Sequence, residues 1–255
     1  MTDIFQIASV GMLDGKQRLE AISMNAASAS LPGYRRQVVA ASTFDAALAA
    51  ADVGAAPNGS ALTAPDAMVS TATRLPVSRQ VDLKPGAMMA TGRPLDVAID
   101  AEDLFFALTD GTQTWLTRGG SFRVNDDGLL VGERGLRVVG TQGDVRLPSI
   151  DVTVQADGRI TQEGATVATL QLFRPSDRTS LMPAQGALLA TAAGVQPAEA
   201  GVGRVRGGTL EASNTDATRE MLGLMALSRQ FESLTHVVQG YDQVLGRAIQ
   251  KLGEI

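Results

Sequence analysis

A seven-residue repeat of apolar side chains near the C-terminus constrains the fold of this chain more than any other feature. One line of the repeat recurs every seven residues, and a second line lies three positions after it. The first line is Leu224, Phe231, Val238, Leu245 and Leu252, and the second is Leu227, Leu234, Tyr241 and Ala248. This spacing is that of an a/d seam, so it predicts a long helix over 216–252 that packs along another helix. Asn214, Thr215 and Asp216 are candidate N-cap side chains before it.

The N-terminal segment carries the same period. Its two lines are Phe5, Met12, Leu19 and Ala26, with Ala8, Gly15, Ile22 and Ala29 in the companion positions. The small residues in these lines allow a close approach between helices, and the pattern stops at Leu31-Pro32-Gly33, a strong helix breaker. We therefore expect a helix over 4–30 that pairs with the C-terminal helix. The alternative is two unrelated amphipathic helices on one globular core.

The middle of the chain has the spacing of β-strands. Short apolar runs such as Leu104–Leu108 and alternating segments such as Leu95–Ile99 and Ala168–Phe173 are separated by turn pairs. The turn pairs are Asp110-Gly111, Asp127-Gly128, Gln142-Gly143, Asp157-Gly158 and Glu163-Gly164. Many short strands at this spacing favour an antiparallel sandwich or irregular barrel. The predicted fold class is therefore α+β: paired N- and C-terminal helices with an inserted antiparallel β-rich domain.

These patterns give a domain organisation with four parts. Residues 1–36 form the N-terminal helix with its breaker, and residues 37–80 form a connecting segment rich in Ala, Ser and Thr. Within that segment, Ala46–Asp52 could form a short helix, and the rest of 40–72 is expected to be loop. Residues 81–207 form the β-rich domain, and residues 208–255 contain the C-terminal helix.

Composition excludes several classes of function. The net charge of −5 argues against a protein that binds nucleic acid or an anionic membrane. The chain has no Cys and one His, so thiolate metal sites and His-rich metal centres are excluded. The longest uncharged run, Thr179–Ala198, contains two prolines and is predicted to be loop and strand, with no direct insertion into a membrane. The N-terminus lacks the pattern of a cleaved secretory signal, so any export is expected to proceed without one.

Few residues have the arrangement that catalysis needs. Asp100, Glu102 and Asp103 form an acidic cluster that could act as a carboxylate pair or hold a cation, but a solvated turn explains it more simply. The segment Arg123–Gly128 resembles a calcium loop but begins with Arg, so a hairpin turn at 126–128 is predicted. His236 is expected on the helix face that is turned away from the seam. We therefore predict no catalytic, metal or cofactor site and no cofactor. A carboxylate-dependent enzyme and a ligand-binding β protein remain the alternatives.

Three blocks of the sequence together resemble the flagellar basal-body rod and hook family. The first combines Asn25 with Pro32-Gly33-Tyr34-Arg35-Arg36, although Ser28 and Ser30 stand where the family usually has Asn. The second comprises Thr91–Ile99, Thr117–Phe122 and Gly128–Val131. The third runs from Gly208 to Asp216 and includes Leu210, Ser213 and Asn214. The length excludes the longer hook and hook-associated proteins. The second block is most similar to the proximal rod subunit, with the distal rod subunit as the alternative.

The resemblance implies a structural protein and not an enzyme. Members of the family assemble helically into the rod, the drive shaft that transmits torque from motor to hook. The implied partners are other rod subunits, copies of the chain itself and the flagellar type III export apparatus, and the implied location is the periplasmic rod of the basal body. The terminal helices would form the inner tube. The residues expected to carry assembly are those of the seam, with Phe5, Met12, Leu19 and Ile22 on the N-terminal side.

Overall fold

A computed structural model describes residues 3–40, 78–191, 194–199 and 204–253. The expected loop at 40–72, with its short helix, lies almost wholly outside the described residues. The chain divides into two compact units. The helical unit comprises Met1–Ser23, Val39–Arg79 and Thr218–Ile255, and the β unit comprises Met24–Val38 and Gln80–Ala217.

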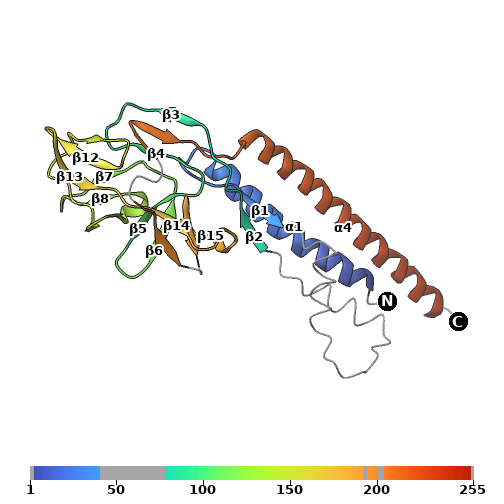
Figure 1. Ribbon diagram of the computed structural model, residues 1–255. Helices are drawn as coiled ribbons and strands as arrows, with labels where there is room; N and C mark the ends of the chain where they lie inside the picture. The colour runs from blue at the N-terminus through green and yellow to red at the C-terminus, as the bar shows by residue number, and fades with distance from the viewer. Residues whose placement is uncertain (1–2, 41–77, 192–193, 200–203, 254–255) are drawn as a thin grey trace, which may run out of the picture. The chain divides into compact units, whose positions relative to one another are not determined.

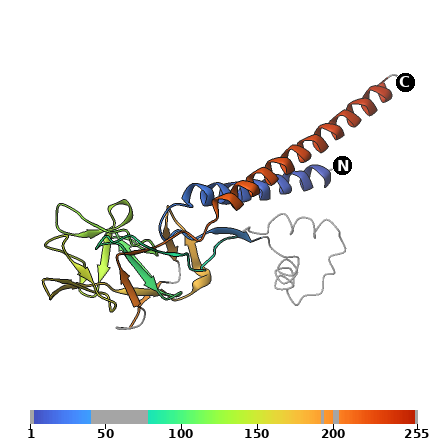
Figure 2. The ribbon, with the colours of Figure 1, turned by 90° about the horizontal axis from the view of Figure 1, so that it is seen from above.

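The helical unit is built on the two terminal helices, which lie side by side and run antiparallel (Figures 1 and 2). Helix α1 spans Asp3–Ser28 and helix α4 spans Ala217–Gly253. The ring of Phe231 lies so close to Gly15 that a Cβ there would stand 2.7 Å from the ring's Cζ, and a Cβ at Gly223 would stand 3.4 Å from Cδ1 of Ile22. The predicted pairing of the terminal helices is confirmed. The companion line of the N-terminal repeat, with Gly15 and Ile22, supplies the described contacts.

The main sheet of the β unit has ten strands, and all of its pairings are antiparallel, as predicted. Its central path, in spatial order, is β15 (Leu181–Pro183), β16 (Leu188–Thr191), β6 (Thr114–Thr117), β5 (Phe105–Thr109), β9 (Arg137–Gly140), β8 (Leu130–Val131) and β7 (Arg123–Val124). Off this path, β10 (Gly143–Asp144) pairs with β9, while β14 (Leu172–Pro175) pairs with β5 and β17 (Val195–Pro197).

Smaller antiparallel sheets complete the unit. One contains β11 (Thr153–Val154), β12 (Arg159–Gln162) and β13 (Ala165–Thr169). Strand β4 (Val97–Asp100) pairs with β18 (Arg204–Gly207), and β3 (Met88–Ala90) pairs with β19 (Thr209–Glu211). The remaining two-stranded sheet pairs β1 (Gln37–Ala40) with β2 (Ser78–Val81). Strands from the end of the β unit therefore pair with strands from its beginning.

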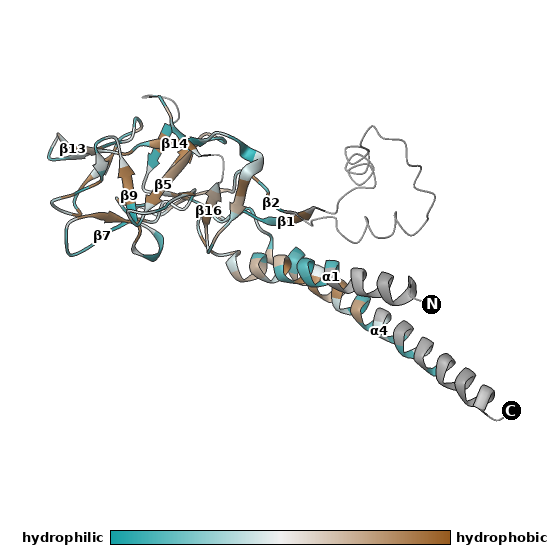
Figure 3. Ribbon diagram, turned by 90° about the horizontal axis from the view of Figure 1, so that it is seen from below, coloured by the Kyte–Doolittle hydropathy of each residue, from teal (hydrophilic) through white to brown (hydrophobic). Residues whose placement is uncertain are grey.

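Strand β5 is buried on both faces because two apolar clusters lie against it. Phe106 and Leu108 belong to the larger cluster, where Phe106 meets Phe122 edge to face with ring centroids 5.1 Å apart. Phe105 and Ala107 belong to the smaller cluster on the other face. This arrangement explains the uninterrupted apolar run in the sequence, and Figure 3 shows β5 in the colour of hydrophobic residues.

Two expectations about strands need correction. Leu95–Ile99 does not alternate between core and water, because Asp96 and Ala98 are as buried as their apolar neighbours. The Oδ2 of this buried Asp96 accepts a hydrogen bond from Thr91 Oγ1 at 2.7 Å, and its Oδ1 lies 3.6 Å from Nη2 of Arg93, which supplies a counter-charge. The run Ala168–Phe173 is also not one strand, since β13 ends at Thr169 and β14 begins at Leu172. All five predicted turn pairs do contain a glycine with positive φ.

We predict that Gly120→Ala unfolds the β unit at a lower urea concentration. A Cβ at Gly120 would stand 1.6 Å from the carbonyl oxygen of Val97, in a place where the two chain segments hydrogen-bond. Backbone cannot move aside cheaply, so the expected loss is about 1–3 kcal/mol or more. Fluorescence of Trp115, the one Trp of the chain, reports the transition. Gly240→Ala is the control, because nothing lies within 4 Å and helix propensity favours Ala. Equal midpoints for Gly120→Ala and the parent would contradict the prediction.

Candidate functional site

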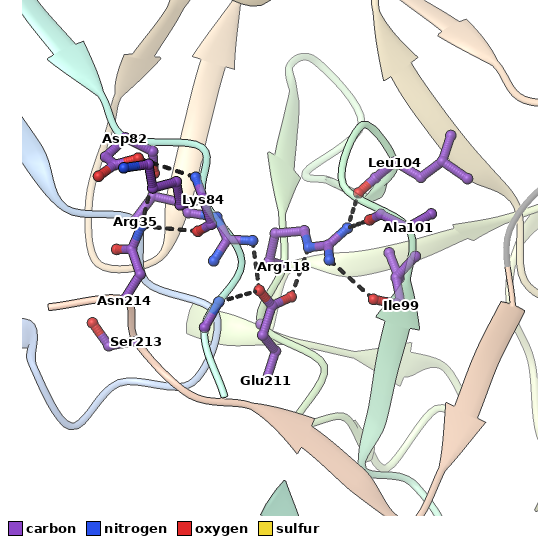
Figure 4. Close-up of polar contacts among 12 residues, drawn as sticks. Arg35, Asp82, Lys84, Ile99, Ala101, Leu104, Arg118, Glu211, Ser213 and Asn214 are labelled. Atoms are coloured by element: carbon purple, nitrogen blue, oxygen red, sulfur yellow. Dashed lines mark hydrogen bonds and ion pairs between the residues drawn. The ribbon is translucent and has the colours of Figure 1, made fainter. Parts of the chain in front are cut away.

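The three sequence blocks meet at one buried carboxylate. The side chain of Glu211, on β19, is fully buried. Its Oε1 accepts a hydrogen bond from Arg35 Nη2 at 2.6 Å and another from the backbone N–H of Gly86 at 2.9 Å. Its Oε2 accepts a hydrogen bond from Arg118 Nε at 2.7 Å. Figure 4 shows Glu211 between the two arginines, each of which comes from a different block.

The Arg118 guanidinium is held on all sides. Its Nη1 donates to the carbonyls of Ala101 and Leu104, and its Nη2 donates to the carbonyl of Ile99 at 3.0 Å. The guanidinium carbon also lies 5.8 Å from the centroid of the Phe105 ring. Burial lowers the pKa of Arg118 below its ordinary value, Glu211 opposes that shift, and the positive charge of Arg35 adds to it. An arginine keeps its proton under such conditions, so Arg118 stays a cation that needs its carboxylate.

Arg35 is less completely satisfied. Its side chain is 1% exposed, yet its Nε and Nη1 have no hydrogen-bond partner among the described residues. Two buried cations therefore share one buried anion. Removing that anion would leave both guanidinium groups without a counter-charge, which is much more costly than losing an exposed ion pair.

The Pro-Gly-Tyr block is fixed by its neighbours in the β unit. Gly33 has a φ of +71°, and a Cβ there would stand 2.0 Å from the backbone nitrogen of Gly119. The N–H of Gly33 donates to the carbonyl of Glu211 at 2.7 Å. Only glycine combines this conformation with this approach. Gly33 is thus the point where the first block contacts both others.

Two asparagines add further side-chain hydrogen bonds around the place where the three blocks meet. Asn25 is buried, and its Oδ1 accepts hydrogen bonds from Tyr34 Oη at 3.1 Å and from the N–H of Gln37 at 2.8 Å. Asn214 Oδ1 accepts from the N–H of Arg36 at 2.7 Å, while its Nδ2 donates to the carbonyls of Asp82 and Lys84. The expectation that Asn214 could cap α4 is therefore wrong, because its amide is committed to the β unit.

The motif residues predicted from the blocks are Asn25, Pro32–Tyr34, Leu210, Ser213 and Asn214. The structure places Leu210 in a buried position and Ser213 before α4, where its Oγ accepts from the N–H of Thr215 at 3.1 Å. That prediction does not include Arg35, Arg118 and Glu211, which carry the charges of the site. The blocks also hold the charged residues Arg36, Arg93, Asp96 and Asp216, so charge alone does not distinguish these three positions in the sequence.

The predicted seam residues are placed as follows. Leu227 is buried, Leu224, Phe231 and Ile22 are half-buried, and Leu19 is 37% exposed. The remaining predicted positions lie outside the described side chains: Phe5, Met12, Leu234, Val238, Tyr241, Leu245 and Leu252. Helix α4 also has a second apolar face, within its first three turns. That face consists of Met221, Leu222 and Met225, which are 56%, 62% and 62% exposed.

Two of the three candidate acidic residues form ion pairs with arginine side chains. Asp100 pairs with Arg206 at 2.5 Å, and Asp103 pairs with Arg174 at 2.7 Å. Among the described residues, no group of three His, Asp or Glu side chains could hold a metal ion. His236 is exposed on α4. No described helix is both long enough and apolar enough to cross a membrane.

The hairpin turn at 126–128 is confirmed. It lies between β7 and β8, and the Oδ1 of Asn125 accepts hydrogen bonds from the N–H groups of Asp127 and Leu129. Asn125 therefore uses its side chain to close the turn.

Comparison with known proteins agrees with the geometry. The family described as the flagellar basal body rod FlgEFG protein C-terminal matches residues 206–251, from the end of β18 into α4. The flagellar basal-body rod protein FlgF of Escherichia coli is 30% identical over 253 residues, which cover 89% of each chain. FlgF of Rhizobium meliloti is 33% identical over 175 residues, covering 67% of this chain and 72% of the relative. FlgG of Bacillus subtilis is 30% identical over 176 residues, covering 62% and 66%.

The chain belongs to the flagellar basal-body rod family, whose members are structural subunits and not enzymes. Within that family it is FlgF-like, since relatives of that name match it over most of its length. The predictions of a rod protein, of its likeness to the proximal subunit and of a non-enzymatic role are confirmed.

We predict that Glu211→Gln lowers the free energy of unfolding of the β unit by about 3–5 kcal/mol. The amide keeps the shape of the side chain but leaves Arg35 and Arg118 buried without a counter-charge. Asp100→Asn is the matched control, because it removes a carboxylate from the ion pair with Arg206 in the adjacent strand pair β4–β18, where both side chains are exposed. That loss should stay within about 1 kcal/mol. Urea unfolding followed by Trp115 fluorescence measures both, and equal losses would contradict the role given to Glu211.

Proposed function

We propose that this rod subunit is built into the rod through α1 and α4: the seam residues named above hold the two helices together, and a second apolar face of α4 contacts neighbouring subunits. The observation that supports this most directly is the pair of apolar faces on α4. One face, with Leu227 and Phe231, packs within the subunit, whereas Met221, Leu222 and Met225 are exposed. Exposed apolar side chains gathered on one helix face are typical of a surface that another protein covers.

The proposed assembly depends on two different faces of α4, one that is covered within the subunit and one that is left for a neighbour. Helix α4 uses one face for α1 and offers another to a neighbouring subunit, so the two contacts do not compete. A contact between unlike surfaces of successive subunits propagates into a helical assembly instead of closing as a dimer. Each neighbour that covers apolar surface also stabilises the helices it covers.

The proposed partners are other rod subunits and further copies of this chain. By the family resemblance, the subunit would reach the periplasmic part of the basal body through the flagellar type III export apparatus. In the assembled rod it would transmit torque from the motor to the hook. Torque transmission requires buried contacts that resist shear and requires no chemistry. Arginine partners for Asp100 and Asp103 support this view over a carboxylate-dependent enzyme.

We expect Met225→Asp to block incorporation into the rod while leaving the isolated subunit stable. Met225 is 62% exposed, so an aspartate there costs the monomer about 0.5 kcal/mol or less, but it places a charge in the proposed contact. Phe231→Asp is the comparison, because it places the charge against Gly15 and should disrupt the helix pair as well.

The measurement is swimming motility together with electron microscopy of isolated basal bodies, and helix content by circular dichroism separates the two variants. Gln230→Asp is the matched control, since it adds the same charge at an exposed α4 position that lies about 140° around the helix from Met225. Normal rods with Met225→Asp would count against the proposed face.

We expect Asp103→Asn and His236→Ala to leave motility nearly intact. Asp103 forms only a partly exposed ion pair, with side chains 35% and 50% exposed, so its loss costs about 1 kcal/mol or less. His236 is exposed on α4, where a change of about 1 kcal/mol is the upper expectation. Loss of motility in Asp103→Asn strains that still assemble complete rods would show that the carboxylate has a role other than packing.

A further inference from the structure

We propose that the segment Arg204–Asn214, here named the closing segment, is the last part of the β unit to dock during folding. The β unit would then stay open until nearly the whole chain is present. The proposal concerns the order of folding, and it follows from what this short segment supplies to the rest of the unit.

The closing segment supplies strand partners and core. Strand β18 pairs with β4 over four residues, from Arg204 opposite Asp100 to Gly207 opposite Val97. Strand β19 pairs with β3, with Leu210 opposite Met89. Val205 is 3% exposed and belongs to the larger apolar cluster. Without the segment, β3 and β4 would have unpaired edges here and the larger cluster would be open to water.

The closing segment also supplies the only carboxylate at the buried end of Arg35 and Arg118 in the described structure. Both arginine side chains are 1% exposed. Burying them before Glu211 arrives would place two like charges in a poorly solvated interior with no anion between them. The part of the chain that precedes the segment therefore cannot adopt its final packing around these arginines by itself.

Sequence separation makes this docking late. Glu211 lies 176 residues from Arg35, 125 from Gly86 and 93 from Arg118. In contrast, β5–β6 and β7–β8 are hairpins between strands that are neighbours in the chain. Local hairpins close at a smaller loss of chain entropy than long-range pairings, and they emerge earlier during synthesis. The hairpins are thus expected to form first and the closing segment to dock on them.

For a subunit that must pass an export channel unfolded, late docking would lengthen the time in which the chain remains open. This consequence rests on the proposed function, whereas the folding order does not. A failure of the folding test below would leave rod incorporation and motility untouched, so the two proposals can fail separately.

The test measures folding and unfolding rates of the full chain by stopped-flow fluorescence of Trp115, which packs against the larger cluster. Leu210→Ala removes a buried side chain from the closing segment, and Leu108→Ala removes one from the central strand β5. A residue that docks after the transition state changes the unfolding rate, and a residue that docks before it changes the folding rate. We expect Leu210→Ala to speed unfolding by about tenfold or more and to change folding less than about twofold. Leu108→Ala should slow folding by a larger factor than Leu210→Ala does.

The proposal is overturned if Leu210→Ala changes the folding rate by a larger factor than the unfolding rate. Glu211→Gln should show the same pattern as Leu210→Ala, with a greater increase in the unfolding rate. If Glu211→Gln fails to fold, the rates of Leu210→Ala alone decide whether the proposal holds. Asp100→Asn is the control for charge, since its ion pair with Arg206 spans 106 residues on the exposed surface of the same strand pair. Both of its rates should stay within about threefold of the parent.

Discussion

The structure of the β unit depends on one carboxylate with two arginines. Glu211 is hydrogen-bonded to Arg35 and Arg118, and through its backbone carbonyl it also accepts from Gly33. Gly33 and Arg35 come from the first sequence block, Arg118 comes from the second and Glu211 from the third, so a single buried anion determines which distant segments must be neighbours. Such an ion pair adds little net stability compared with apolar packing, but the penalty for leaving either arginine unpaired is large. Its effect is to make alternative arrangements of these segments unfavourable.

The terminal helices and the hairpin turns can be predicted from the sequence because their signals are local. The seven-residue repeat gives the two terminal helices within two residues of their observed bounds, and glycine-containing pairs mark the hairpin turns. It failed where the environment is decided by distant residues. Asp96 interrupts an apolar run and looks solvent-facing, yet it is buried where its backbone forms an isolated bridge with Ser121. Leu170 and Gln171 continue an alternating pattern, yet Leu170 forms an isolated bridge with Gly140 that separates two strands.

The candidate site shows the same division. Most of the motif residues predicted from sequence are polar or are a proline or glycine, and most of them do lie where the three blocks meet. The charged residues that join the blocks were passed over because Arg35, Arg118 and Glu211 look like ordinary surface residues when each is read with its immediate neighbours. Only their long-range pairing, across as many as 176 positions, gives them their role. Family resemblance brought the three blocks together as one signature without indicating that they touch.

The contact between Gly15 and Phe231 has a mechanical consequence. The ring fits against α1 only where a side chain is absent, since a Cβ at Gly15 would stand 2.7 Å from it. One turn towards the C-terminus, the same face of α1 presents Arg18 and Leu19, which offer no such recess. To slide in that direction, the ring would have to lift out and pass over these bulkier positions. The contact therefore opposes sliding of α4 towards the C-terminal end of α1, and an axial force in that direction is carried from one helix to the other.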